Sequence, residues 1–152
     1  MAITFENVVK DRVLDSLITL IKTEFGMDVH LDPVFQNRSP RYFNLTLNSD
    51  ELVSLLSSGQ VRQYEIEIRY YVQIGGEYYK NTHFDEISKT VERFKRLFAP
   101  DNYASYSPSG TYKWHDGQIT SINYQPDRET EEEDSDLQIT SITFQCNSME
   151  VS

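Results

Sequence analysis

Residues 118–125 read QITSINYQ, and residues 138–145 read QITSITFQ. The two segments are near copies, and both are rich in the β-branched and aromatic residues that fit a pleated surface. Between them, residues 127–136 contain seven acidic residues and one arginine, a composition too charged and too poor in apolar residues to pack. The pattern predicts two adjacent antiparallel strands that form a C-terminal β-ribbon, with residues 126–136 as a projecting acidic loop.

The apolar residues of each copy change phase partway along the segment. Ile119 is out of register with Ile122, and Ile139 is out of register with Ile142. A β-bulge at the Thr-Ser pair of each strand would restore the apolar face and bend the ribbon. The alternative is that Ile119 and Ile139 face outward, into a partner.

Two stretches upstream carry apolar residues at helical spacing. The first, which Thr4 is placed to cap and Gly26 to end, contains Phe5, Val9, Val13, Leu17, Leu20, Ile21 and Phe25. The second is expected over 82–98, with Thr82 as its cap and Pro100 after its end, and its stripe is Phe84, Ile87, Val91, Phe94 and Phe98. A shorter helix is predicted over 49–59, because a capping serine and two acids open that segment.

Strand patterns fill most of the remaining chain. Alternation is strongest over 64–74, where Tyr64, Ile66, Ile68, Tyr70, Val72 and Ile74 share the predicted core face. Shorter strands are predicted at 29–31 and 43–47, and tight turns at Gly75-Gly76 and Asp116-Gly117. The expected fold class is α+β, a mainly antiparallel sheet flanked by two amphipathic helices. The length of 152 residues predicts a single domain, 1–152.

Charge and cysteine content limit the binding partners and the cellular location that the sequence allows. The net charge is −10, and residues 127–136 supply −6 of it, so the remaining body is only mildly acidic. Arg93, Lys95 and Arg96 form the densest basic group, and we interpret them as a solvated helix face rather than a nucleic-acid footprint. Cys146 cannot form an intramolecular disulfide and is interpreted as a small buried hydrophobe. Without an uninterrupted hydrophobic segment, we expect a soluble protein that is not exported.

Catalytic and metal-binding patterns are missing from the sequence. His30, His83 and His115 fall in three different predicted elements, and no phosphate-binding glycine motif or nucleophile elbow occurs. Glu65 and Glu67 share a strand face and could act as acid and base, but a charged outer face is the preferred interpretation. The acidic run lacks the spacing of a calcium loop, although a weak divalent-ion contact stays open. We therefore expect neither enzymatic activity nor a cofactor.

The order of these elements resembles the tail terminator and neck (head-tail joining) proteins of tailed bacteriophages. The resemblance rests on RYFNLTL at 41–47, SGQVRQYEIEIRYY at 58–71, the helix at 83–98 and the closing strands 118–125 and 138–146. It implies a non-enzymatic virion protein that forms a ring, typically hexameric, on the last ring of the tail tube. The implied partners are other copies of itself, the tail tube protein, and neck or connector proteins. DNA would pass without specific binding, and no membrane is involved.

Such a protein would be located in the tail or neck of the virion, after assembly in the host cytoplasm. The resemblance leaves open whether it is a tail terminator, a head-closure protein or another neck ring. A different class, an acidic decoy that binds a basic partner, also stays open. A decoy should spread its charge along a face, whereas here the charge is concentrated in one predicted loop.

Two groups of residues are candidate contact sites. The acidic loop would face the lumen or a partner, where negative charge repels passing DNA; its candidates are Glu129, Glu131, Glu132, Glu133, Asp134 and Asp136. Tyr71, Tyr78 and Tyr79 lie on the side or turn opposite the predicted core face, and aromatic residues are enriched in interface cores. They are candidates for a subunit interface, or else ordinary, partly exposed tyrosines on a wet sheet.

Overall fold

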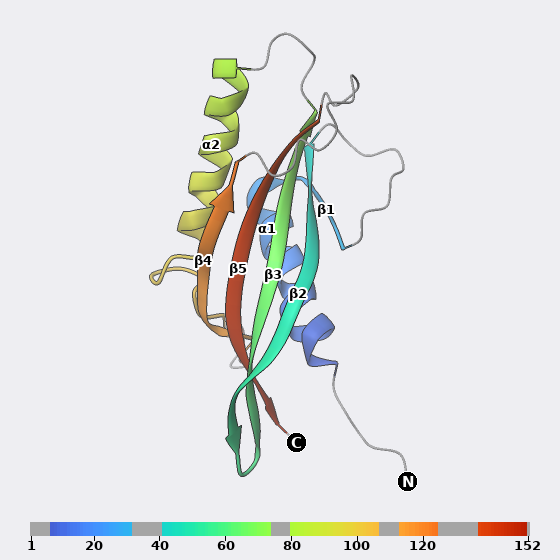
Figure 1. Cartoon of the computed structure of the whole chain (residues 1–152), viewed down its shortest axis with the longest axis vertical. Coiled ribbons are helices and arrows are strands. Elements are labelled where there is room, and N and C mark those ends of the chain that lie inside the picture. Colours follow the sequence, from blue (N-terminus) through green and yellow to red (C-terminus); the bar gives the residue numbers. More distant parts are fainter. Residues whose placement is uncertain (1–6, 32–40, 74–79, 107–112, 125–136, 152) are drawn as a thin grey trace.

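A computed structural model describes residues 7–31, 41–73, 80–106, 113–124 and 137–151. Its centre is one five-stranded sheet in the order β1-β2-β3-β5-β4 (Figure 1). The strands are β1 (Asp28–His30), β2 (Arg41–Leu56), β3 (Gly59–Gln73), β4 (His115–Asn123) and β5 (Leu137–Val151). β1 runs parallel to β2, and every other neighbouring pair is antiparallel. The predicted α+β class with a mainly antiparallel sheet is confirmed.

The two predicted helices are present, with differences at their ends. A π-helical segment, η1 (Val9–Leu14), leads into α1 (Asp15–Phe25). Gly26 ends α1 in the left-handed conformation (φ 65°), and its N–H donates to the Lys22 carbonyl at 2.9 Å. The second helix, α2, spans Lys80–Leu97. Thr82 therefore lies inside α2, so its assignment as the cap is wrong, while Thr4 lies outside the described residues. The Thr-x-x-Asp sequence at 82–85 suits the first turns inside a helix as well as a cap. The pattern therefore placed the start of α2 too late in the chain.

Both helices pack on the same face of the sheet. Phe94 of α2 stacks on Phe25 of α1 with ring centroids 4.9 Å apart and lies 5.3 Å from Phe43 of β2. Phe98 lies 4.6 Å from Phe144 of β5. The predicted alternation in β3 is confirmed by the burial of Tyr64, Ile66, Ile68, Tyr70 and Val72. The predicted inner stripe of α2 is buried at Ile87, Val91, Phe94 and Phe98, whereas the Phe84 side chain lies outside the described residues.

The helix predicted over 49–59 is wrong, because β2 continues to Leu56 and turns at residues 57–58 into β3. Residues Ser49 to Leu56 pair with β3 down to the Leu56–Gly59 pair. Register shifts at Asn48 and Val53 interrupt the two-residue alternation. The shift at Val53 puts Leu52 and Leu55, three residues apart in the sequence, on one face of β2, and this spacing also suits a helix stripe.

The turn predicted at Asp116-Gly117 is a bulge inside β4 instead. The register shifts between His115 and Gln118, and Asp116 takes a positive φ of 52°. The Gly117 N–H donates to the Ala104 carbonyl at 2.7 Å, which fixes the bulge against the chain that follows α2. Asp116 has the positive φ that tight hairpin turns require, but here the bulge bends β4 and does not reverse the chain.

The C-terminal ribbon is confirmed, since β4 and β5 pair antiparallel with Ile122 opposite Ile142. The predicted bulge is found in β4, between Ile119 and Ser121, and Ile119 packs at the edge of the core. The matching bulge in β5 is wrong: its pairing with β3 is continuous, Thr140 is buried, and Ile139 lies opposite Tyr71. For Ile139 the outward-facing alternative holds.

Candidate functional site

The sheet face opposite the helices, here called the open face, carries no covering helix among the described elements. Alternation along β3 places Glu65, Glu67, Arg69 and Tyr71 on it. The rings of Tyr71 and Tyr42 stack with centroids 4.7 Å apart and an interplanar angle of 8°. Ile139, opposite Tyr71 on β5, completes a half-buried apolar area that we call the tyrosine patch (Tyr42, Tyr71 and Ile139).

The acids on the open face are engaged by their neighbours. Glu67 forms an ion pair with Arg69, and Glu65 accepts a hydrogen bond from the Gln145 amide at 3.1 Å. Each carboxylate therefore has its own polar partner on the sheet. This arrangement fits the charged outer face that the sequence predicts better than a shared acid–base site.

The β2–β3 hairpin extends beyond the helices as a slender ribbon, which we call the arm (residues 48–63) (Figure 1). Its tip exposes Leu52, Val53, Leu55 and Leu56, with exposed fractions of 49%, 52%, 73% and 44%. In the described part of the chain, all the large exposed hydrophobic residues fall within this five-residue stretch. Clustering of this kind indicates a contact surface, because isolated exposed apolar residues are normal but contiguous ones are not.

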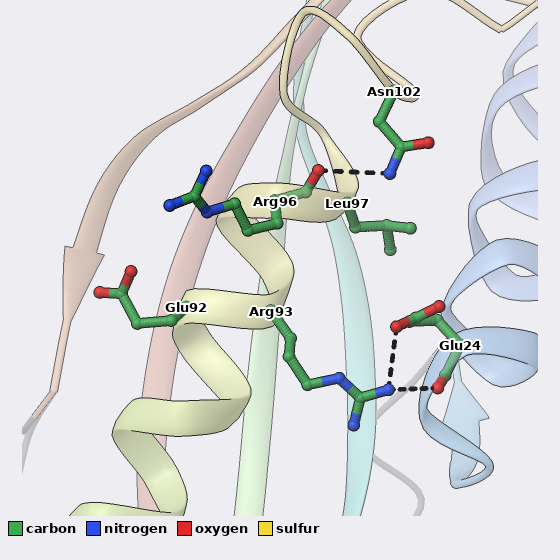
Figure 2. Close-up of a pocket in the computed structure, with 6 residues that line it drawn as sticks. All are labelled: Glu24, Glu92, Arg93, Arg96, Leu97 and Asn102. Carbon is green, nitrogen blue, oxygen red and sulfur yellow. Dashed lines mark hydrogen bonds and ion pairs between the residues drawn. The ribbon is translucent and has the colours of Figure 1, made fainter.

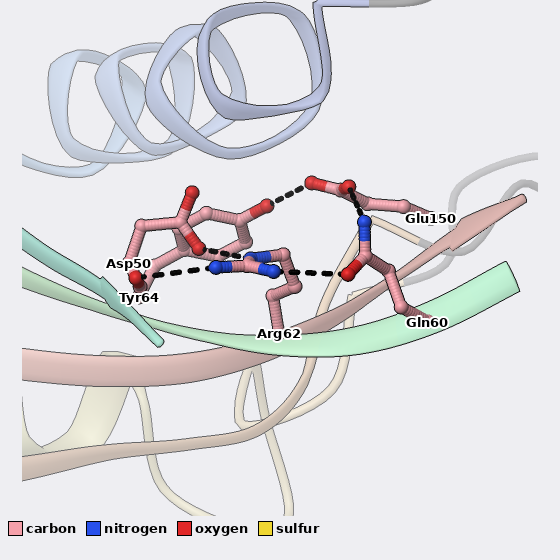
Figure 3. Close-up of polar contacts among 5 residues, drawn as sticks. All are labelled: Asp50, Gln60, Arg62, Tyr64 and Glu150. Atoms are coloured by element: carbon pink, nitrogen blue, oxygen red, sulfur yellow. Dashed lines mark hydrogen bonds and ion pairs between the residues drawn. The ribbon is translucent and has the colours of Figure 1, made fainter. Parts of the chain in front are cut away.

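A polar network fixes the base of the arm (Figure 3). The Arg62 guanidinium donates to Asp50 at 2.5 Å and to the Gln60 side chain at 2.9 Å. Glu150 of β5 accepts from the Tyr64 hydroxyl at 2.5 Å and from Gln60 at 3.1 Å. Burial, with a further contribution from the Glu150 hydrogen bond, raises the pKa of the Tyr64 phenol far above its ordinary value. The network joins β2, β3 and β5, so the arm is held as part of the sheet.

The junction of α1 and α2 contains a small pocket of about 240 Å³ (Figure 2). Arg93 spans it, donating to both the carbonyl and the carboxylate of Glu24 at 2.7 and 2.9 Å. The same guanidinium lies 4.7 Å from the centre of the Phe25 ring. Arg93, Lys95 and Arg96 are all exposed, which confirms the predicted solvated helix face.

A larger groove of about 850 Å³ lies where α2 ends beside β4. Its apolar lining includes Phe98, Ala99, Pro100, Ala104 and Ile119, and its polar lining includes Lys95, Ser105, Asp116 and Gln118. The strand order places β4 at one end of the sheet, while β2 is on the other side of the central pair β3 and β5. The lining of the groove also includes Asn147 of β5 and Gln63 of β3, at the base of the arm.

The structure places one of the predicted interface tyrosines, Tyr71, on the open face. Tyr78, Tyr79 and the acidic candidates Glu129, Glu131, Glu132, Glu133, Asp134 and Asp136 lie outside the described residues. The arm was missed by sequence reasoning. Its signal was the apolar group Leu52, Val53, Leu55 and Leu56 between polar residues on both sides, which was interpreted as part of a short helix.

Cys146 is buried, as predicted, although its strand continues to Val151. Burial raises the pKa of its thiol. Within the described ranges, no cluster of three or more His, Cys, Asp or Glu residues could hold a metal ion. Among the helices described here, none combines the length and the apolar character required to cross a bilayer.

No protein-family model matches the chain, and no curated protein matches it in sequence. Solved structures do match in fold. One is a chain from the "Virion of native gene transfer agent (GTA) particle", with a TM-score of 0.54 and 9% sequence identity. The match covers 95% of this chain and 99% of that one, so the two share a fold over almost their entire lengths.

Proposed function

We propose that this chain is a structural protein of a tailed-phage-like virion, where it forms a ring at the junction of tail and neck. In this role it ends the tail tube, joins the tail to the head, or does both. The observation that carries the proposal is the near-complete fold match to a chain of a gene transfer agent virion. At 9% identity the match concerns fold, so the assignment to virion assembly is our inference.

The surfaces support an assembly role rather than catalysis. The chain presents an open sheet face with the tyrosine patch, and an arm whose tip gathers the exposed apolar residues of the described chain. Such features are typical of proteins that act by contact with neighbours. A ring requires two different patches on each subunit, because a cyclic assembly of more than two copies is heterologous. The arm and the open face offer such patches, and we propose a hexamer by analogy with tail rings.

The decisive experiment is omission of the protein during particle assembly. Lysates that lack it should contain tails of irregular length, or heads and tails that fail to join, when viewed by electron microscopy. Restoring the wild-type chain in trans should restore joined particles. Normal infectious or transducing particles in its absence would refute the proposal.

A further inference from the structure

One face of the arm tip is turned toward the side of the sheet that carries the helices. Leu52 pairs with Arg62, and Leu55 pairs with Gln60. These side chains of β3 point to the same side as Tyr64, which is buried in the core beneath the helices. Leu52 and Leu55 therefore form one apolar surface on the helix side, which we call the inner tip face, and the described residues leave it largely exposed.

The first helix (η1 and α1) runs along the same side of the sheet toward the arm. Near its C-terminal end, Phe25 contacts Phe43 in the body of the sheet, with ring centroids 5.2 Å apart. Near its start, the Arg12 guanidinium donates to the Met149 carbonyl at 2.9 Å, and Met149 pairs with Val61 of the arm. Figure 3 shows this helix passing over the polar network at the base of the arm. The chain that precedes η1 therefore starts beside the arm.

The residues before η1 have the composition to cover the inner tip face. Residues 1–6 read MAITFE, with Ile3 and Phe5 among their apolar side chains. Phe5 precedes Val8 by three residues and Val9 by four, a helical spacing that places all three on one face. Val8 is buried and Val9 packs against the core, so that face is the one turned toward the sheet.

The length of this segment also fits the arm. A helix rises about 1.5 Å per residue and a strand about 3.3 Å, so a helix from Arg12 back to Phe5 would span about 10 Å, the length of about three strand residues. Counted from Val61 toward the tip, that length ends at the turn of the hairpin, beside the Leu56–Gly59 pair. A side chain at this level can reach the inner tip face.

From these features we propose that residues 1–6 pack as a strap on the inner tip face of their own chain, with Phe5 against Leu52 and Leu55. The same chain supplies the strap because η1 tethers it at the base of the arm, which gives its apolar side chains a high effective concentration at the tip. Leu56 follows Leu55 on the strand and points to the other face, so it stays available to neighbours. The strap belongs to the isolated chain and does not depend on the proposed ring.

Paired cysteines test the contact directly. In a chain that carries Phe5→Cys and Leu55→Cys, mild oxidation at low protein concentration should link the two residues within one chain. Intact-mass analysis detects this link as the loss of the thiol hydrogens without dimer formation. Cys146 is buried and provides an inert background. Phe5→Cys with Ser54→Cys is the matched control, because Ser54 is exposed beside Leu55 but points to the other face, and this pair should stay unlinked.

Thiol labelling provides a second, independent measurement. The Leu55→Cys thiol should react with an aromatic disulfide reagent about tenfold more slowly in the full chain than in a chain without residues 2–6, because a packed strap must open before the reagent enters. The Ser54→Cys thiol should react at the same rate in both chains. Phe5→Ser takes the place of the deletion if the shortened chain does not fold.

Each outcome decides for or against the strap. A link within one chain, together with slow labelling of Leu55→Cys, supports it. A link between two chains would mean that a second copy supplies the segment, and it would overturn the strap as proposed. The absence of a link, or equal labelling rates with and without the strap, would overturn it as well. The ring is tested separately, since none of these measurements uses assembled particles.

Discussion

Phe94 is the residue on which the two layers of the protein meet. It is fully buried and contacts the rings of Phe25, Phe43 and Phe98, with centroids 4.9, 5.3 and 6.0 Å away. Its removal would leave a cavity between both helices and the sheet.

Phe94→Ala should therefore lower the free energy of unfolding by about 3–5 kcal/mol. Urea denaturation followed by circular dichroism measures this change. Lys89→Ala is the control on the same helix, because its exposed ion pair with Asp85 is worth only about 0.3–0.5 kcal/mol. Equal effects of the two substitutions would contradict the packing described here.

Gly117 is constrained by space rather than by its backbone conformation. A Cβ at this position would lie 2.9 Å from the Ala104 carbonyl oxygen and 3.2 Å from the Phe144 ring. Gly117→Ala should therefore destabilise the protein by about 1–3 kcal/mol, the usual range for overpacking. Thermal denaturation tests this expectation. An unchanged midpoint would mean that the bulge in β4 relaxes without cost.

Three buried protonated groups predict that the folded protein is less stable at alkaline pH. The pKa values of Tyr64, Tyr70 and Cys146 are all raised, chiefly by burial. A raised folded-state pKa contributes stability that is complete below the unfolded pKa and is lost as pH rises above it. The unfolded values are 9.0 for cysteine and 10.0 for tyrosine, so the free energy of unfolding should fall from about pH 9 upward.

Urea titrations between pH 8 and 10.5 measure this decline. Cys146→Ala should remove the part that begins near pH 9 and keep the part due to the tyrosines. A free energy of unfolding that stays constant over this interval would contradict the burial of these groups.

At the scale of elements, strict alternation and strict helical spacing were good predictors. The core face of β3, the inner stripe of α2 and the pairing of β4 with β5 follow from apolar side chains that must face one interior. The tip of the arm could not be predicted in this way. Leu52 and Leu55 have no core to face, and the bulge at Val53 gives them a helical spacing that a local pattern cannot distinguish from a helix.

The same limit of local sequence patterns explains why only one of the two bulges predicted in the C-terminal ribbon is present. One bulge in β4 is real, but β5 lies between β3 and β4, and its uninterrupted pairing with β3 leaves it no room for a bulge. Thr140 is buried there instead of Ile139. The local pattern of apolar residues therefore predicted that this segment is a strand. Pairing with the neighbouring strands determined which face each side chain of β5 occupies.

The acidic run yields a prediction at this scale. Its composition predicts that residues 127–136 contribute no core packing, while β4 and β5 on either side are paired along their lengths. Replacing the run by a short glycine-serine linker should therefore leave the thermal midpoint within a few degrees of that of the wild type. A large drop in the midpoint would show that the run is packed.

At the scale of the whole molecule, a two-layer fold leaves one face of the sheet and one arm for neighbours. The helices cover a single face, so the tyrosine patch and the apolar arm tip remain outside the core. Of the predicted interface tyrosines, Tyr71 lies on the open face, while Tyr78 and Tyr79 lie outside the described residues. The arm tip was not predicted as a contact surface, because the prediction relied on surplus aromatic residues and the tip carries none.

The central claim is that the chain forms a ring at the junction of tail and neck. Electron cryomicroscopy of purified particles carrying a tagged copy of the protein, labelled through the tag, tests it most directly. The account predicts label at the head-proximal end of the tail and a closed ring of copies in the averaged density. Label along the tail tube, label on the head shell, or particles without the protein would contradict it.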